Sequence, residues 1–141
     1  MLSLISKIHS ATSFYLKKQL AEQGLPDMVS SHGNILFRLS TNGRMTMSEL
    51  SKNIHRDKST TTVLVKKLEN AGYIQRETSE TDNRVTYILL TEKGADYAAA
   101  TAVISEKLIA RCYQGFSEIE KQAAFAFISR ISANFTEGQE P

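Results

Sequence analysis

The chain has 141 residues, of which 17 are lysine or arginine and 15 are aspartate or glutamate, for a formal net charge of +2. Its 41% hydrophobic and 23% charged residues are typical of a globular domain and exclude a disordered or fibrous chain. The single cysteine, Cys112, excludes an internal disulfide framework and favours a reducing, cytoplasmic location. A membrane-spanning helix needs about 20 apolar residues, and since no such run is present, we expect no membrane partner and no signal peptide.

The first part of the chain predicts two helices. Apolar side chains recur at helical spacing over residues 2–20, and Gly24 and Pro26 interrupt the pattern. A second helix is expected to begin at Ser30 or Ser31 and to end at Asn42-Gly43, which favours a left-handed stop.

The next residues predict a pair of helices joined by a tight turn. Thr46 and Glu49 have the spacing of a capping box, which opens a short helix through Ile54. Asp57 is expected to cap the following helix, which runs to Asn70 with Gly72 just beyond its end.

The pattern then changes from helical to extended. Residues 73–78 and 85–90 are rich in β-branched and aromatic side chains, and the turn-forming residues 79–83 separate them, so they predict a β-hairpin. Thr91 is expected to cap a long helix that ends near Gln114.

A last helix is predicted at the C-terminal end. Ser117 and Glu120 form a second capping box, and the helix that follows runs through Phe135. Its stripe of apolar residues over 119–135 is too apolar to stay in water, so we expect it to be covered in a homodimer rather than within one subunit.

The order of these elements favours a mainly α fold with a small β-hairpin wing. A short helix, a tight turn, a second helix and a hairpin in succession are typical of a winged helix-turn-helix, and a generic α+β domain is the alternative. Between Arg44 and Lys93 there are nine basic and seven acidic residues, and the rest of the chain balances. The small surplus weakly favours a polyanionic partner for the middle third.

The helix that begins after Asp57 has two different faces. The side expected to pack inward carries Thr61, Leu64, Val65, Leu68 and Ala71. The opposite side carries Ser59, Thr62, Val63, Lys66 and Asn70. Four of these five can hydrogen-bond to phosphates or base edges, and none is acidic. Val63 suits either contact with a thymine methyl group or an ordinary exposed position.

At this point the residues resemble a known family. The run Met47–Arg76 is similar to the DNA-binding core of MarR-type transcriptional regulators. Thr81-Asp-Asn-Arg84 is similar to the family's wing tip, and Leu90-Thr-Glu-Lys-Gly94 to its exit into a long helix. The resemblance implies DNA contacts from Lys58, Ser59, Thr60, Thr62, Val63, Lys66 and Arg84. It also implies that Asp82 orients the wing by pairing with Arg84 or another wing arginine.

Two residues depart from the family's pattern. A basic residue often stands where this chain has Val63, which puts its base preference in doubt. Glycine often stands where this chain has His55, in the turn between the paired helices. Histidine tolerates a left-handed backbone better than most residues, so the same tight turn is expected to form with His55 in place of glycine.

The resemblance also implies an organisation and a function. The chain 1–141 would be a single subunit with its winged helix-turn-helix lobe at 30–93 and a helical dimerisation region at 1–22 and 94–136. As a homodimer it would bind a palindromic operator in double-stranded DNA. It would act as a sequence-specific transcriptional regulator, and a repressor is expected rather than an activator. The alternative is a winged-helix protein-interaction module without DNA-binding activity.

A small aromatic or phenolic ligand would release such a regulator from DNA. Phe14, Tyr15, His32 and Phe37 are available to line a ligand site, but each also suits core or surface, so no ligand residue is assigned.

Other chemistry finds little support in the sequence. His9, His32 and His55 lie on three different predicted elements without metal-ligand spacing, so no metal or other cofactor is expected. Cys112 shares a helix side with Leu108 and Ile109 and is expected to be a small buried hydrophobe. No catalytic motif is present, so an enzyme is not expected.

Overall fold

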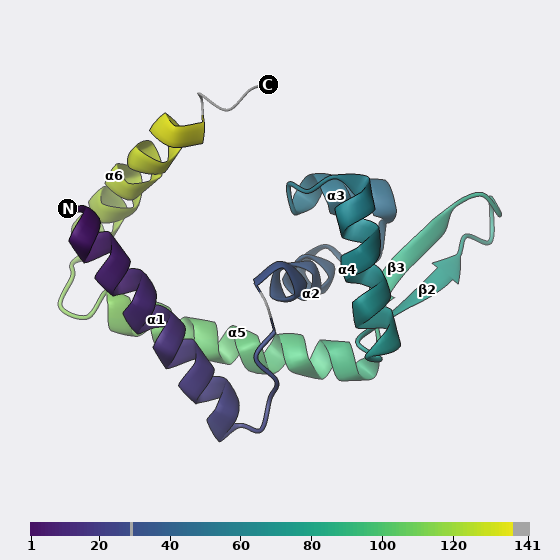
Figure 1. Ribbon diagram of the computed structural model, residues 1–141, viewed down its shortest axis with the longest axis horizontal. Coiled ribbons are helices and arrows are strands. Elements are labelled where there is room, and N and C mark those ends of the chain that lie inside the picture. The colour runs from purple at the N-terminus through teal and green to yellow at the C-terminus, as the bar shows by residue number, and fades with distance from the viewer. Residues whose placement is uncertain (29, 137–141) are drawn as a thin grey trace. The chain divides into compact units, whose positions relative to one another are not determined.

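The computed structural model describes residues 1–28 and 30–136 (Figure 1). Its helices and its hairpin follow one another in the predicted order, and one short strand is present in addition. The elements are α1 (Leu2–Glu22), α2 (Ser30–Asn42), β1 (Met45–Thr46), α3 (Met47–Asn53), α4 (Lys58–Asn70), β2 (Ile74–Thr78), β3 (Thr86–Leu90), α5 (Glu92–Cys112) and α6 (Glu118–Thr136). The mainly helical fold with a hairpin wing is confirmed. The chain divides into two compact units, Met1–Ser105 and the part that begins at Glu106.

A three-stranded antiparallel sheet lies in the first unit, with strand order β1-β3-β2. The predicted hairpin pairs β2 with β3 from Ile74 opposite Leu90 to Thr78 opposite Thr86. The sequence did not predict β1, which has two residues and pairs Met45 with Ile88. The sheet therefore joins the wing to the segment before α3.

The core of the first unit lies between α2, α3, α4 and the inner face of the sheet. Its fully buried side chains include Ile35, Leu36, Leu50, Val65 and Ile88. Each such burial contributes about 1.5–3 kcal/mol, so the core fixes α4 at the surface of the unit.

The predicted capping boxes are present at both sites. Before α3, the Glu49 N–H donates to Thr46 Oγ1 at 3.2 Å, and the Thr46 N–H donates to the Glu49 carboxylate at 2.8 Å. Before α6, Ser117 and Glu120 make the same reciprocal bonds at 3.3 Å and 2.7 Å. These bonds satisfy backbone N–H groups that a helix start leaves free, and they explain why the helices begin at these residues.

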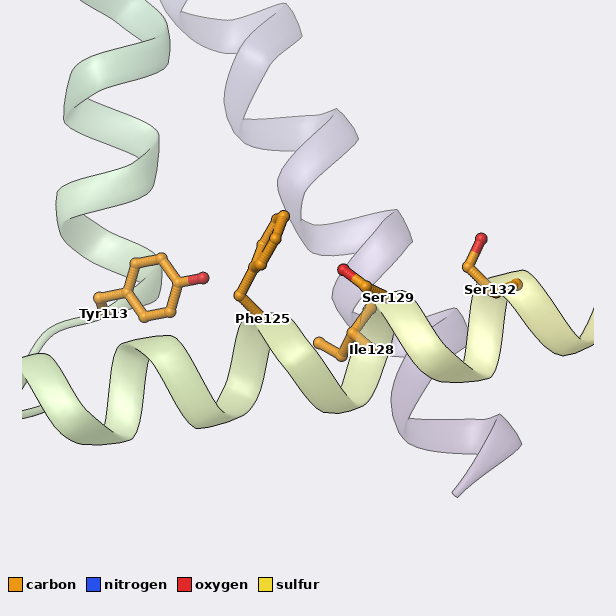
Figure 2. Close-up of a pocket in the computed structure, with 6 residues that line it drawn as sticks. Tyr113, Phe125, Ile128, Ser129 and Ser132 are labelled. Atoms are coloured by element: carbon orange, nitrogen blue, oxygen red, sulfur yellow. The ribbon is translucent and has the colours of Figure 1, made fainter.

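The second unit contains the end of α5 and the whole of α6. Large apolar side chains of α6 are exposed, among them Ile119 (79%), Phe127 (61%) and Phe135 (71%). An open hollow of about 610 Å³ lies along α6, and Figure 2 shows the Tyr113 ring beside Phe125, with Ser129 and Ser132 further along the helix.

The prediction that Cys112 is buried was wrong, because it is exposed at the end of α5. Ile109, on the same side of α5, is 56% exposed. Helical spacing correctly identified this side as apolar, but no other part of the described chain covers it. Within residues 1–28 and 30–136, no helix is long and apolar enough to span a membrane.

Candidate nucleic-acid interface

The turn between α3 and α4 is tight and contains a left-handed residue. The His55 backbone has φ 54°, and its N–H donates to the Lys52 carbonyl at 3.3 Å. The following N–H, from Arg56, donates to the Ser51 carbonyl at 3.1 Å. Histidine thus takes the backbone conformation that the turn demands, as predicted, and α4 starts three residues later, at Lys58.

Asp57 caps the N-terminus of α4, as predicted. Its carboxylate accepts the Thr60 N–H at 2.6 Å and the Thr60 hydroxyl at 3.1 Å. These hydrogen bonds, the backbone one first, hold the pKa of Asp57 below its ordinary value. The cap therefore uses the hydroxyl proton of Thr60, one of the predicted contact residues, and ties the Asp57 charge to the end of the helix.

The inner face of α4 agrees with the predicted periodicity at four of five positions. Thr61 and Val65 are fully buried, Leu68 is 3% exposed, and Leu64 packs against the core while partly buried. Ala71 is exposed, so its predicted inward position was wrong. Ala71 still has helical backbone angles as the C-cap of α4, and its N–H donates to the Lys67 carbonyl at 3.0 Å. The chain turns away at Gly72, where φ is 82°, so Ala71 lies at the exposed end of the helix.

The outer face of α4 is exposed over its whole length. The structure brings six of the seven predicted contact residues together on this helix, and all are exposed: Lys58, Ser59, Thr60, Thr62, Val63 and Lys66. The Thr62 hydroxyl donates to the Lys58 carbonyl at 2.7 Å, so in this rotamer it offers acceptor lone pairs and a methyl group to a partner. Val63 is 55% exposed.

The two carboxylates nearest this face, those of Asp57 and Glu69, are both hydrogen-bonded to other parts of the chain. Glu69 lies at the edge of α4, and its carboxylate accepts a hydrogen bond from Arg76 of β2 at 3.1 Å. Asp57 is held in the helix cap. The exposed face, defined by Ser59, Thr62, Val63 and Lys66, is therefore free of acidic side chains and offers polar groups and one positive charge.

The seventh predicted residue, Arg84, lies in the segment that connects β2, which ends at Thr78, to β3, which begins at Thr86. Figure 1 shows that this segment forms the tip of the wing, beyond the ends of the two strands. The Arg84 guanidinium donates to both carboxylate oxygens of Asp82, at 3.0 Å and 3.2 Å, and the Arg84 backbone N–H donates to the same carboxylate at 3.1 Å. The side-chain bonds, followed by the backbone bond, lower the pKa of Asp82. The Arg84 side chain is 90% exposed, so the pair holds the guanidinium in one direction and leaves it accessible.

A cluster on the β2–β3 hairpin, one residue pair from its turn end, was missed by sequence reasoning. Arg44 lies just before β1, with its guanidinium carbon 4.2 Å from the centre of the Tyr87 ring and a nitrogen 3.8 Å from the Glu77 carboxylate. Tyr87 is opposite Glu77 in the β2–β3 register. Only the pairing of distant strands brings these residues together, so no local pattern could have revealed them.

The histidines do not gather into a site. His9 lies on α1, His32 on α2 and His55 in the turn, and among residues 1–28 and 30–136 no three His, Cys, Asp or Glu side chains are placed to hold a metal. His32 is partly buried, and its Nε2 atom has no hydrogen-bond partner among the residues that the structure describes. Burial, and then the charge of Lys67, lower the pKa of His32.

Comparison with known proteins identifies the family. The model of the MarR family matches residues 30–86. An uncharacterised HTH-type transcriptional regulator of Bacillus subtilis, YwhA, is 30% identical over 127 residues, which cover 88% of this chain and 91% of that protein. The chain belongs to the MarR family. MarR-family members are transcriptional regulators and not enzymes, so the resemblance found in the sequence is confirmed.

Solved structures of MarR-family proteins share the winged helix-turn-helix fold. The structure of the S. aureus MepR–DNA complex superimposes with a TM-score of 0.75 at 21% identity, over 95% of this chain and 97% of that one. Bordetella bronchiseptica BpsR, whose DNA binding is regulated by 6-hydroxynicotinic acid, superimposes with a TM-score of 0.71 at 14% identity, over 94% and 92% of the two chains. At these identities the likeness establishes the fold alone.

Proposed function

We propose that this MarR-family chain binds a palindromic operator in double-stranded DNA as a homodimer and acts as a sequence-specific repressor. Residues 30–93 would form its DNA-binding lobe, and 1–22 with 94–136 its dimerisation region. The observation that carries the proposal is the exposed outer face of α4. It offers Ser59, Thr62, Val63 and Lys66 without an acidic side chain among them.

The chemistry of this face suits a DNA groove. A helix fits the major groove of B-DNA, where hydroxyl and ammonium groups read base edges or bind the flanking phosphates. Acidic side chains would be repelled there, and the nearby carboxylates of Asp57 and Glu69 are bound to the helix cap and to Arg76. The Val63 side chain is exposed at a position where it would meet a thymine methyl group.

The wing would add a second contact. The exposed Arg84 guanidinium at the hairpin tip suits the narrow, negative minor groove. Asp82, whose carboxylate accepts two bonds from that guanidinium, would orient it before DNA arrives. On DNA the phosphates would compete with Asp82 for the same donors, so the wing would add affinity for any duplex more than for one sequence.

The homodimer is supported by the exposed apolar side chains near both ends of the chain. On α1, Leu2 is 72% and Ile8 58% exposed, and on α6, Ile119 is 79% and Phe135 71% exposed. Large apolar patches are rare on monomers and mark interaction surfaces. A two-fold dimer would read two half-sites about 10 base pairs, or near 34 Å, apart. Light scattering should give a particle of twice 15.7 kDa, and a monomer at micromolar concentration would contradict the proposal.

A small aromatic or phenolic ligand would regulate the dimer. The support is that BpsR responds to an aromatic acid, 6-hydroxynicotinic acid, and that this chain has exposed rings on its first two helices, Phe14 (70%) and Phe37 (57%). A ligand that binds the folded dimer raises its melting temperature. A panel of phenolic and pyridine carboxylic acids tests this, and no shift across the panel would contradict it.

Fluorescence anisotropy over a salt series separates the roles of the two DNA-contacting regions. We expect Thr62→Ala and Lys66→Ala to lose about 1–3 kcal/mol on the cognate duplex and less on random DNA, because they read base edges. Arg84→Ala should weaken binding to both duplexes and lower the salt slope by about one per site, because it removes a phosphate-neutralising charge. Lys18→Ala, on α1, removes an exposed charge outside α4 and the wing, and it serves as the control once light scattering shows that it is as dimeric as the wild type.

Two outcomes would contradict these roles. Arg84→Ala binding like the wild type at every salt concentration would mean that the wing does not touch DNA. Saturable binding to no duplex at low salt would favour the alternative, a winged-helix module that binds protein.

A further inference from the structure

The end of α4 is bound to the start of α5 at three successive backbone carbonyls. The Lys93 ammonium donates to the Ala71 carbonyl at 2.8 Å, and the Thr91 hydroxyl donates to the Gly72 carbonyl at 2.5 Å. The Thr91 N–H donates to the Tyr73 carbonyl at 3.1 Å. These carbonyls follow the last turn of a helix, where backbone acceptors have no partner within the helix. We call this set of contacts the α4–α5 junction.

The backbones of the junction are in direct contact at Gly94. A Cβ atom on Gly94 would lie 1.9 Å from the Tyr73 carbonyl oxygen, so no other residue fits there without movement. The Gly94 N–H donates to the Thr91 hydroxyl oxygen at 3.1 Å, while that hydroxyl donates to Gly72. The Thr91 and Gly94 contacts therefore hold Gly72 and Tyr73 through backbone or a short side chain, whereas the contact on Ala71, the residue next to α4, comes from Lys93.

Lys93 makes the one contact in this set that comes from a long side chain. Its ammonium lies 4.4 Å from the centre of the Tyr73 ring as well as on the Ala71 carbonyl. The negative end of the α4 dipole and the face of an aromatic ring both attract a cation. The Tyr73 ring is itself held edge-on by Tyr97 at 5.6 Å, and the Tyr97 hydroxyl donates to the Pro26 carbonyl at 3.0 Å.

We propose that Lys93 is a positioning residue, which fixes the C-terminal end of α4 against α5 and so sets the angle at which the outer face of α4 meets DNA. The inference rests on the proposed DNA-binding function. α4 has 13 residues and so spans about 20 Å, with Ser59 and Thr62 near its far end. A tilt of about 5° at the junction moves that end by nearly 2 Å, enough to break a hydrogen bond to a base edge.

Lys93→Met tests the proposal, because methionine keeps much of the apolar stem and removes the ammonium. We expect it to weaken binding to the cognate duplex at least fivefold and to random duplex less than twofold. The salt slope should stay unchanged, because the Lys93 ammonium is bound to protein and neutralises no phosphate. Lys93→Arg restores the charge and the donor and should return cognate affinity to within twofold of the wild type. Glu92→Gln, which changes the adjacent charge, is the matched control.

Amide hydrogen exchange gives a readout that does not depend on DNA. In Lys93→Met the amides of residues 71–73 should exchange faster than in the wild type and in Glu92→Gln. Wild-type exchange together with wild-type affinity would overturn the proposal. Equal loss on both duplexes with a salt slope lowered by about one would also overturn it, because Lys93 would then contact phosphate. If the wild type binds no duplex, the proposed function fails, and hydrogen exchange alone decides whether Lys93 holds the end of α4.

Discussion

The substitution Gly94→Ala gives opposite expectations from local propensity and from the structure. Gly94 lies in the first turn of α5, and alanine is favoured over glycine inside a helix by about 1 kcal/mol. The added Cβ, however, would lie 1.9 Å from the Tyr73 oxygen and 3.0 Å from the Tyr73 carbonyl carbon. Both are backbone atoms, so no side chain can rotate to make room.

The cost can be estimated from the contacts that must change. Overpacking costs about 1–3 kcal/mol, and weakening the Thr91–Tyr73 hydrogen bond costs about 1 kcal/mol. Since the helix gains about 1 kcal/mol from alanine, the net destabilisation is about 1–3 kcal/mol. The free energy of unfolding from urea titration, at a fixed protomer concentration, measures it.

Gly33→Ala is the matched control. Gly33 lies in α2, and a Cβ there would meet no atom of the described residues within 4 Å, so alanine should stabilise the chain by about 0.5–1 kcal/mol. If Gly94→Ala is as stable as the wild type or more stable, the backbone of α5 does not approach Tyr73 as closely as 1.9 Å implies, and Gly94 does not hold the α4–α5 junction.

Three further predictions concern the turn, a cap and a histidine. His55→Gly should raise the free energy of unfolding by up to about 1 kcal/mol, because glycine accepts φ 54° without the cost of a left-handed side chain, as urea titration will show. Thr46→Ala should lower the same quantity by about 1 kcal/mol through loss of the α3 cap, and unchanged stability would count against the capping box. Burial and the Lys67 charge lower the pKa of His32 in the folded chain from 6.5, so the unfolded chain takes up the proton first as the pH falls. Stability should therefore be greatest above pH 6.5 and decline as the pH falls towards the lowered pKa, and His32→Gln should remove that part of the decline in urea titrations across the range.

Local patterns predicted the features that depend on neighbouring residues. The Thr46–Glu49 and Ser117–Glu120 capping boxes and the Asp57 cap involve residues three apart, so the sequence alone predicts them. The exposed outer face of α4 follows from helical spacing in the same way. That spacing failed at Ala71, the exposed C-cap residue of α4, and at Cys112, where an apolar helix side is exposed.

The features that depend on distant residues could not be predicted. Strand β1 has two residues and exists because Met45 pairs with Ile88, and the Arg44–Tyr87 contact depends on the same pairing. The contact of Lys93 with Ala71 joins residues 22 apart, and no helical or strand period encodes it. The DNA contacts of Lys66 and Arg84 remain predictions, since they depend on a partner outside the chain.

Selection of sequences from a random duplex pool by the purified protein shows directly whether two α4 helices read DNA as a pair. If the outer faces of two α4 helices read DNA in a homodimer, the selected sequences should share a palindrome with half-sites about 10 base pairs apart. The same selection with Lys66→Ala should relax the preference within each half-site while keeping the spacing. Selected sequences without a shared motif, or with a single unpaired half-site, would contradict the proposal that a homodimer reads a palindrome through its two α4 helices.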